Sequence, residues 1–260
     1  MRVAHTALVL AAAALAAGAA PLDPAAIDQG GEIAYRRALQ SAAAERRLNA
    51  EPGIATRMRG IANRIFVAAP VLDPAARALS WTINVVTDPA VDALVYPGGR
   101  VLVHSGLTAL GLSDEEVGAI IAHVLAHALL GHDRERMEAD MPAADAGAAD
   151  PNRRALAVAN VARETLGRRY TDAQVASADR ASVELLAHAA YSPKAAVSAW
   201  RRLPADAVLV RRFPVTEARL AALESAATAA MPLYEETRAK AEATPRAAKP
   251  ATTGGSRSLR

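Results

Sequence analysis

A capped apolar stretch carrying two histidines four residues apart stands near the middle of this 260-residue chain. Ser113 precedes three acidic residues, 114–116, and this is the pattern of a helix N-cap with a capping box. The apolar run that follows favours a helix as far as Leu130, where Gly131 can end it. We expect this helix, which contains His123 and His127, to carry whatever chemistry the protein has.

The rest of the chain predicts a small sheet within a helical body. Hydrophobic residues make up 52% of the sequence but aromatic residues only 3%, and the excess is alanine, which favours closely packed helices. β-Branched residues at 81–86 and the segments 94–96 and 100–104, which flank a Pro97-Gly98-Gly99 turn, predict strands and a hairpin. Other helices are expected over 33–48, 55–67, 153–168 and 172–190, and from Ser192 and Thr216, with 137–151 as a surface loop. The predicted fold class is α+β, mainly α.

The two ends of the chain differ in composition from its body. Residues 1–19 combine Arg2, an apolar run and small residues at cleavage spacing, which is typical of a secretory signal peptide; an uncleaved anchor is the alternative. Residues 20–236 are expected to form one domain, and 237–260 a disordered basic tail. The chain has no cysteine for a lipid anchor or a disulfide. We expect a periplasmic protein, or else a secreted one, with no nucleic-acid partner and with membrane contact only through its ends.

The histidine spacing suits a shared metal ion. Residues at i and i+4 lie on one face of a helix with Cβ atoms about 5–6 Å apart. Zinc peptidases with an HExxH helix hold zinc by this pair and activate water with the glutamate after the first histidine. That position is Val124 here, and general-base help is worth roughly 10²–10⁴-fold in rate. Glu116 lies two turns away, about 10 Å, which is too far to replace it. A lone His-x-x-x-His pair is more often structural than metal-binding.

The motifs around the pair, taken in order, give it more weight. They are Asp88-Pro89, the stretch 97–107, Asp114-Glu115-Glu116, Ala122-His123 to His132, Ala178-Asp179, Ala190-Tyr191-Ser192-Pro193, and Phe213-Pro214 with Thr216-Glu217 and Arg219. This order resembles the zinc metalloendopeptidases related to the CAAX prenyl protease, the HtpX heat-shock protease and the mitochondrial Oma protease. The resemblance implies a zincin-like fold with a small sheet packed on the active-site helix, and zinc held by His123 and His127. It also implies that Asp179 orients a ligand histidine, although a capping or salt-bridging role is the alternative.

Departures from that family fall where the chemistry would be. Its third zinc ligand, a glutamate four residues before the aspartate, corresponds to Val175. Other departures are Asp92 for asparagine, Ala190 for glycine and Phe213 for histidine. Two neutral imidazoles fall short of the three protein ligands that catalytic zinc normally has, so zinc binding is expected to be weak. Candidates for a replacement ligand are His104, His132, His188 and Glu184.

Three functions follow from these residues. The first is a degenerate, catalytically impaired relative, a pseudoenzyme that binds extended polypeptide or an envelope protein as an added strand. The second is an active zinc-dependent metalloendopeptidase with a rearranged metal site. The third is a metal carrier that uses His123 and His127 with borrowed ligands.

Overall fold

The computed structural model describes residues 22–142, 145 and 147–243. These residues form a mainly helical molecule with one three-stranded sheet, which confirms the predicted fold class. The first half comprises α1 (Pro24–Ala44), α2 (Pro52–Ala68), short 3-10 turns η1 (Ala69–Val71) and η2 (Pro74–Ala78), β1 (Thr82–Val86), β2 (Ala93–Tyr96), β3 (Arg100–His104), α3 (Gly106–Ala109) and α4 (Asp114–Leu129). The second half comprises α5 (His132–Asp140), α7 (Pro151–Gly167), α8 (Asp172–His188), α9 (Ala195–Arg202), α10 (Val208–Arg212) and α11 (Glu217–Ala243).

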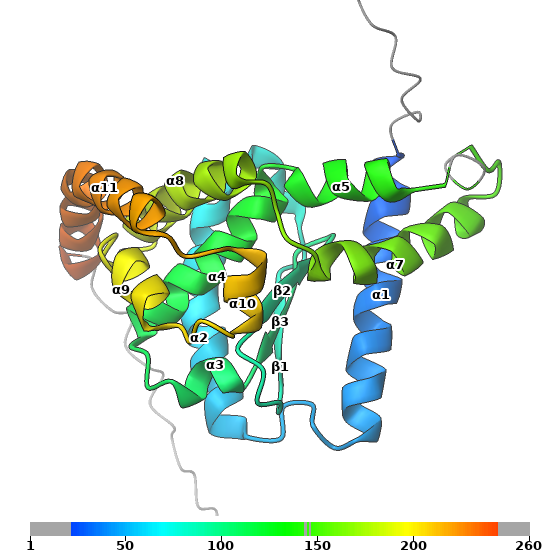
Figure 1. The fold of residues 1–260 in the computed structure, drawn as a ribbon, viewed down its shortest axis with the longest axis horizontal. Helices are drawn as coiled ribbons and strands as arrows, with labels where there is room; N and C mark the ends of the chain where they lie inside the picture. The colour runs from blue at the N-terminus through cyan, green and yellow to red at the C-terminus, as the bar shows by residue number, and fades with distance from the viewer. Residues whose placement is uncertain (1–21, 143–144, 146, 244–260) are drawn as a thin grey trace, which may run out of the picture.

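The sheet has the strand order β1-β3-β2, with β1 parallel and β2 antiparallel to β3. The β2–β3 hairpin turns at Gly98 and Gly99, both at positive φ, which glycine adopts without steric cost. Side chains alternate between the two faces, so Val95 and Val101 join the core cluster of α2 and α4, whereas Leu102 joins that of α1 and α7. Figure 1 shows α1 on the opposite side of the sheet from α2 and α4.

Helix α4 is the centre of the molecule. It begins as the sequence predicts: Ser113 accepts a hydrogen bond from the Glu116 amide, and the Glu116 carboxylate accepts one from the Ser113 amide. Every residue from Glu116 to His127 is buried. A helix that is buried all round needs neighbours on every side. The sheet, α2, α8 and α9 supply them, so the histidine pair lies inside the core.

Several predicted boundaries shift in the structure. The first helix begins at Pro24 rather than at 33, because Asp23 caps it and proline suits its first turn. The predicted loop over 137–151 is wrong for its beginning, because α5 continues to Asp140. Helix α11 continues to Ala243, past the expected start of the tail at residue 237. The predicted signal peptide, 1–19, and residues 244–260 lie outside the described residues.

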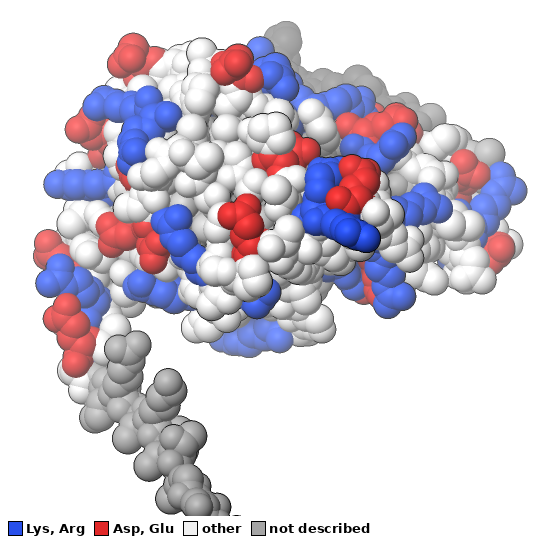
Figure 2. Space-filling view, turned by 90° about the horizontal axis from the view of Figure 1, so that it is seen from below, with Lys and Arg blue, Asp and Glu red and all other residues white. Residues whose placement is uncertain are grey.

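The surface of the described residues shows two further properties. None of the helices in that part of the chain combines the length and the apolar character needed to span a membrane. On the face seen in Figure 2, acidic and basic side chains are interspersed with uncharged ones. On this face, therefore, charges of one sign do not dominate.

Candidate active site

His123 and His127 point to the same side of α4, as their spacing predicts. Their Nε2 atoms lie 3.3 Å apart, and their side chains are among the most buried in the molecule, His123 at 0% and His127 at 1% exposure. Two nitrogens bound at 2.0–2.1 Å to one tetrahedral zinc ion would be separated by about 3.3 Å. The pair therefore has the spacing of two zinc ligands, and the same spacing also allows one imidazole to donate a hydrogen bond to the other.

Asp179, on α8, lies directly behind the first histidine. Its Oδ1 atom is 3.0 Å from His123 Nδ1, so the carboxylate can fix the imidazole with its Nε2 toward His127. Arg219, near the start of α11, donates to the same carboxylate from Nε at 2.8 Å and from Nη2 at 2.9 Å. Asp179 thus contacts a histidine and an arginine at once, which is the geometry that each of its two alternative roles requires.

His132 approaches the pair from the wrong side to complete a metal site. Its Nδ1 lies 3.1 Å from Nδ1 of His127, and its Nε2 lies 3.3 Å from Ser177 Oγ. Because His132 contacts the nitrogen of His127 that points away from His123, the three imidazoles form a chain and cannot surround one ion. With Asp179 ionised, each imidazole can be neutral and donate toward the carboxylate, and His123 Nδ1 approaches Asp179 Oδ1 to 3.0 Å.

An aromatic cover closes the space over the histidines. Phe213, which stands where the resembled family has histidine, packs against His123 and His127 with ring centroids 4.7 and 5.0 Å apart. Trp200 contacts His123 at 4.9 Å and Tyr170 contacts His127 at 4.0 Å. A zinc peptidase keeps an open coordination position for water and substrate, whereas here three aromatic rings pack directly against the two imidazoles.

The electrostatics of the site favour neutral imidazoles. Burial lowers the pKa of His123 below its usual value, despite the opposing pull of Asp179. Burial also lowers the pKa of His127 and His132. Burial opposes charge on Asp179 as well, but the hydrogen bonds from Arg219 outweigh it and bring the pKa of that carboxyl to about 2. The charged groups in direct contact with His123 and its carboxylate are therefore those of the Asp179–Arg219 pair, and Arg212 acts on His123 and His127 from farther away.

The donor set does not fit a catalytic zinc ion. Val124 and Val175 are both buried and belong to the same apolar cluster, where the family would place a general base and a third ligand. Val175 lies one helical turn before Asp179 on the same face of α8, so it borders the site without offering a donor atom. Among the residues that the structure describes, no group of three or more histidine, cysteine, aspartate or glutamate side chains could hold a metal ion.

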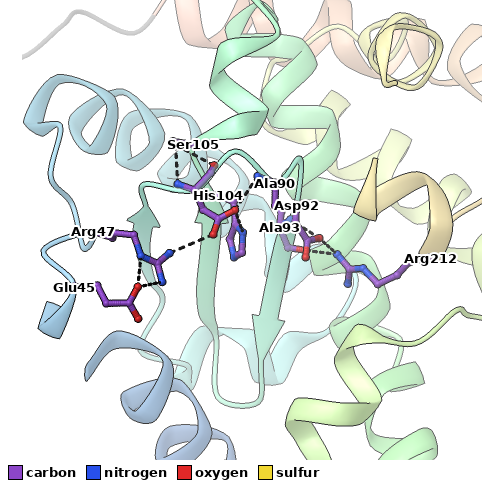
Figure 3. A network of polar contacts seen from close by, with 9 residues as sticks. Glu45, Arg47, Ala90, Asp92, Ala93, His104, Ser105 and Arg212 are labelled. Atoms are coloured by element: carbon purple, nitrogen blue, oxygen red, sulfur yellow. Dashed lines mark hydrogen bonds and ion pairs between the residues drawn. The ribbon is translucent and has the colours of Figure 1, made fainter. Parts of the chain in front are cut away.

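The other candidate ligands lie elsewhere. His104 is at the end of β3, with Nδ1 3.8 Å from Asp88 Oδ1, and Arg47 binds that carboxylate at 3.2 Å (Figure 3). Glu184 is exposed and His188 is half-buried toward the end of α8. Within the described ranges, none of these three candidates joins His123 and His127 in a group of three or more metal-binding side chains.

A second buried ion pair, missed by the sequence analysis, lies beside the site. Arg212 binds Asp92 and donates to the carbonyl group of Ala93 at 2.7 Å (Figure 3). It also donates to the carbonyl group of Leu166 at 3.0 Å. Its side chain is 3% exposed. The Asp92 substitution is thus matched by an arginine 120 residues later. The sequence offered only a weak signal for this pair. Asp92 is one of the departures from the resembled pattern, and Arg212 directly precedes another, Phe213.

Tyr170 and Asp133 form another buried pair that sequence reasoning missed. The Tyr170 hydroxyl donates to Asp133, which lies on α5 directly after His132. Burial raises the pKa of Asp133 to about 6. This pair holds the Tyr170 ring against His127, so it helps to close the cover over the imidazoles.

Ala190, which stands where the resembled family has glycine, has a backbone conformation that is unfavourable for alanine. Ala190 follows α8 with φ of 54°, in the left-handed region that glycine adopts more easily. Arg64 donates to the carbonyl groups of Ala189 at 3.0 Å and Ala190 at 2.6 Å, which supports this helix end. The backbone therefore keeps the conformation that the resembled glycine would serve.

A histidine pair on a buried central helix, with a carboxylate behind the first histidine and a small sheet alongside, defines a zincin-like metallopeptidase fold. The chain belongs to peptidase family M48, whose model matches residues 55–227. A segment of 59 residues is 34% identical to the mitochondrial metalloendopeptidase OMA1 of Schizosaccharomyces pombe and covers 23% of this chain and 18% of that protein.

Two further relatives extend the comparison. The mitochondrial metalloendopeptidase OMA1 of Homo sapiens is 32% identical over 63 residues, which are 24% of this chain and 12% of that protein. The metalloprotease LoiP of Escherichia coli is 28% identical over 120 residues, 44% of this chain and 47% of its own length. The matched segments thus span less than half of these relatives. Zinc belongs to the family, and its presence here has to be judged from the residues described above.

Proposed function

We propose that this chain is a catalytically silent member of the M48 family, exported to the periplasm, which binds extended polypeptide in the cell envelope. One observation carries the loss of catalysis: His123 and His127 are buried beneath Phe213, with valines at the general-base and third-ligand positions. A water molecule activated for peptide hydrolysis needs a base and an open position on the metal. Neither is available in this arrangement.

The edge of the sheet supports the binding role. Strand β2 is an edge strand, and His104 N donates to Asp92 O at 3.0 Å, so the alternation of the ladder turns the backbone groups of Ala93 and Val95 away from β3. The groups of Ala93 are used within the protein, because its amide donates to the Asp92 side chain and its carbonyl accepts from Arg212. An added strand therefore cannot pair with the backbone of Ala93. Of the two outward-facing residues, this leaves Val95 for backbone hydrogen bonds to a bound peptide.

A cavity of about 370 Å³ lies beside Val95. It runs between the β2–β3 turn and the end of α4. Its lining includes Val95, Trp81, Leu129 and Leu130. Leu130 is 39% exposed, although it is a large apolar side chain. An extended peptide could pair with Val95 through its backbone and place an apolar side chain in the cavity.

The first experiment measures zinc content and casein cleavage of the mature protein purified without chelator. We expect no stoichiometric zinc and no cleavage, whereas stoichiometric zinc with chelator-sensitive cleavage would overturn the proposal. A Val124→Glu plus Val175→Glu variant is expected to gain zinc, and Val124→Gln plus Val175→Gln is its size-matched control. The result for the unmodified protein decides the question even if the variants fold poorly.

A second experiment tests binding separately from catalysis. Fluorescently labelled, unfolded casein is titrated with the protein, and anisotropy reports the complex. Leu130→Asp, which places a charge at the cavity, should weaken binding about tenfold or more, as one desolvated charge costs at least ~1.4 kcal/mol. Leu156→Asp is the control, because Leu156 is similarly exposed on α7 but does not line the cavity. Equal effects of both variants, or no binding at all, would contradict this role.

Family membership favours the alternative, an active metalloendopeptidase with a rearranged site. The 3.3 Å separation of the two Nε2 atoms and the carboxylate behind His123 are compatible with it. It requires Phe213 to move and a donor to enter from outside the present group. The zinc and casein measurement above distinguishes the two proposals.

A further inference from the structure

A cavity on the far side of the sheet from the histidines has no role in the function proposed above. It has a volume of about 580 Å³ and lies between α1 and α7, two helices packed against each other and over one face of the sheet. Its lining includes Arg37 and Ser41 of α1, Asn160 and Arg163 of α7, and Tyr96 of β2. Cavities of this size suit small organic molecules.

The hydroxyl group of Tyr96 is the most informative atom in this cavity. The residue is 5% exposed, with its ring packed edge-on against Tyr35 at 5.4 Å, yet within the described part of the chain no side chain or backbone group bonds to the hydroxyl. Tyr96 shares the lining of the cavity with Arg163, which acts on it electrostatically, so a ligand bound there can supply the acceptor that the protein does not. Burial, followed by the nearby Asp92, raises the pKa of Tyr96 to about 12. The hydroxyl therefore keeps its proton and can donate it to a ligand in the cavity.

Two arginines share the lining of the cavity with this donor. Arg163 forms no ion pair or hydrogen bond with any residue in the described ranges, and Arg37 donates from Nη1 to Asn160 Oδ1 at 2.9 Å, which leaves most of its N–H groups free. Glu164 also lines the cavity, so the charged side chains here sum to one positive charge. The walls between them are apolar and small, formed by Ala34, Ala38 and Ala159.

We propose that this cavity binds a small organic carboxylate. Its two oxygens accept hydrogen bonds from Arg37, Arg163 and the Tyr96 hydroxyl, and its apolar part lies against the three alanines. A single negative charge balances the net charge of the lining, whereas a phosphate dianion would bring an uncompensated charge close to Glu164. Paired arginine donors match the planar geometry of a carboxylate.

The test uses hexanoate as the probe and isothermal titration calorimetry on the purified full chain. We expect saturable binding at one site, and no binding of hexanamide, which has the same shape without the charge. Arg163→Gln and Tyr96→Phe should each weaken binding about tenfold, since a hydrogen bond to a charged group contributes roughly 1.5–3 kcal/mol. Arg36→Gln is the matched control, because Arg36 is exposed on α1, pairs with Glu32 and does not line the cavity.

Each outcome decides the proposal. Absence of saturable hexanoate binding overturns it, and so does binding that survives both Arg163→Gln and Tyr96→Phe. Tighter binding of inorganic phosphate than of hexanoate overturns the carboxylate class. Arg163 is exposed and Tyr96→Phe keeps the ring in the core, so both variants should fold, and circular dichroism checks this. Tyr96 lines both this cavity and the one beside Leu130, whereas Arg163 lines this cavity and not the other, so the Arg163→Gln result is the one that is independent of the casein experiments.

Discussion

Arg219 holds Asp179 by two parallel hydrogen bonds, from Nε to Oδ2 at 2.8 Å and from Nη2 to Oδ1 at 2.9 Å. The same guanidinium group donates to the Phe213 carbonyl at 2.8 Å and lies 4.0 Å from the centre of the Trp200 ring. One side chain therefore fixes the carboxylate behind His123 and also the segment that covers it. The histidine pair is thereby held within a packed core.

Replacement of Arg219 by methionine tests how much this pair contributes to stability. The variant leaves the buried Asp179 without its partner, which typically costs 3–5 kcal/mol, and we expect the free energy of unfolding in urea to fall by about that amount. Arg201→Met is the control, since Arg201 is exposed and its nearest carboxylate, Glu224, is 3.9 Å away. A loss below about 1 kcal/mol would mean that Asp179 is not isolated from water.

Phe213→Ala should both destabilise the protein and uncover the imidazoles. Truncating a buried phenylalanine costs roughly 3–5 kcal/mol, measured here by urea unfolding. Diethyl pyrocarbonate, which modifies accessible imidazoles, should react with His123 and His127 in this variant but not in the unmodified protein. Phe66→Ala, a similar truncation where the ring stacks on Trp81, should destabilise without uncovering them. Equal reactivity in both variants would show that Phe213 is not the cover.

The Asp92–Arg212 pair predicts a non-additive double variant. Arg212→Met alone leaves a buried carboxylate and Asp92→Asn alone leaves a buried guanidinium, and each should cost about 3–5 kcal/mol in unfolding free energy. The double variant should recover much of this loss, because no unpaired charge then remains. Simple addition of the two losses would argue against a coupled buried pair.

Ala190→Gly is expected to stabilise the protein by about 1 kcal/mol, because alanine at φ of 54° carries a steric penalty that exceeds the entropy cost of glycine. Ala176→Gly, at an exposed position inside α8, should instead destabilise it by about 0.5–1 kcal/mol. Thermal unfolding followed by circular dichroism measures both changes. A destabilising Ala190→Gly would mean that the left-handed conformation is not strained.

Stability should fall as the pH drops from 7 to 5. The pKa values of His123, His127 and His132 are lowered in the folded state, so below about 6.5 the unfolded chain takes up protons that the folded chain excludes. Asp133 acts oppositely, since its pKa is raised to about 6 and the folded state gains its proton as the pH falls. The destabilising effect of the three histidines exceeds the stabilising effect of the one aspartate, so the net stability falls.

Urea unfolding across this pH range measures the slope, which amounts to about 1.4 kcal/mol per pH unit for each net proton. His127→Gln should make the slope shallower by about one proton. Stability that is flat or rises toward pH 5 would show that at least two of the imidazoles are protonated in the folded protein.

The sequence by itself determined the local elements and the family pattern. Ser113 and Glu116 specify the start of α4, glycines at 98 and 99 specify the hairpin turn, and the spacing of His123 and His127 places them on one helix face. These features depend on residues close together in the chain, whose geometry is fixed by backbone conformation. The sequence also showed that Val124 and Val175 stand where the resembled family has glutamates, because a missing donor atom can be recognised from residue type alone.

Tertiary structure alone decided what surrounds the histidines. Arg219 reaches Asp179 across 40 residues, Arg212 reaches Asp92 across 120, and Phe213 covers a pair on a helix far earlier in the chain. Such contacts depend on how helices pack, and small shifts in packing change which nitrogen of an imidazole meets which partner. His132 illustrates this, because it follows Gly131 and its direction could not be fixed from the sequence, whereas in the structure it contacts Nδ1 of His127, the nitrogen that faces away from His123.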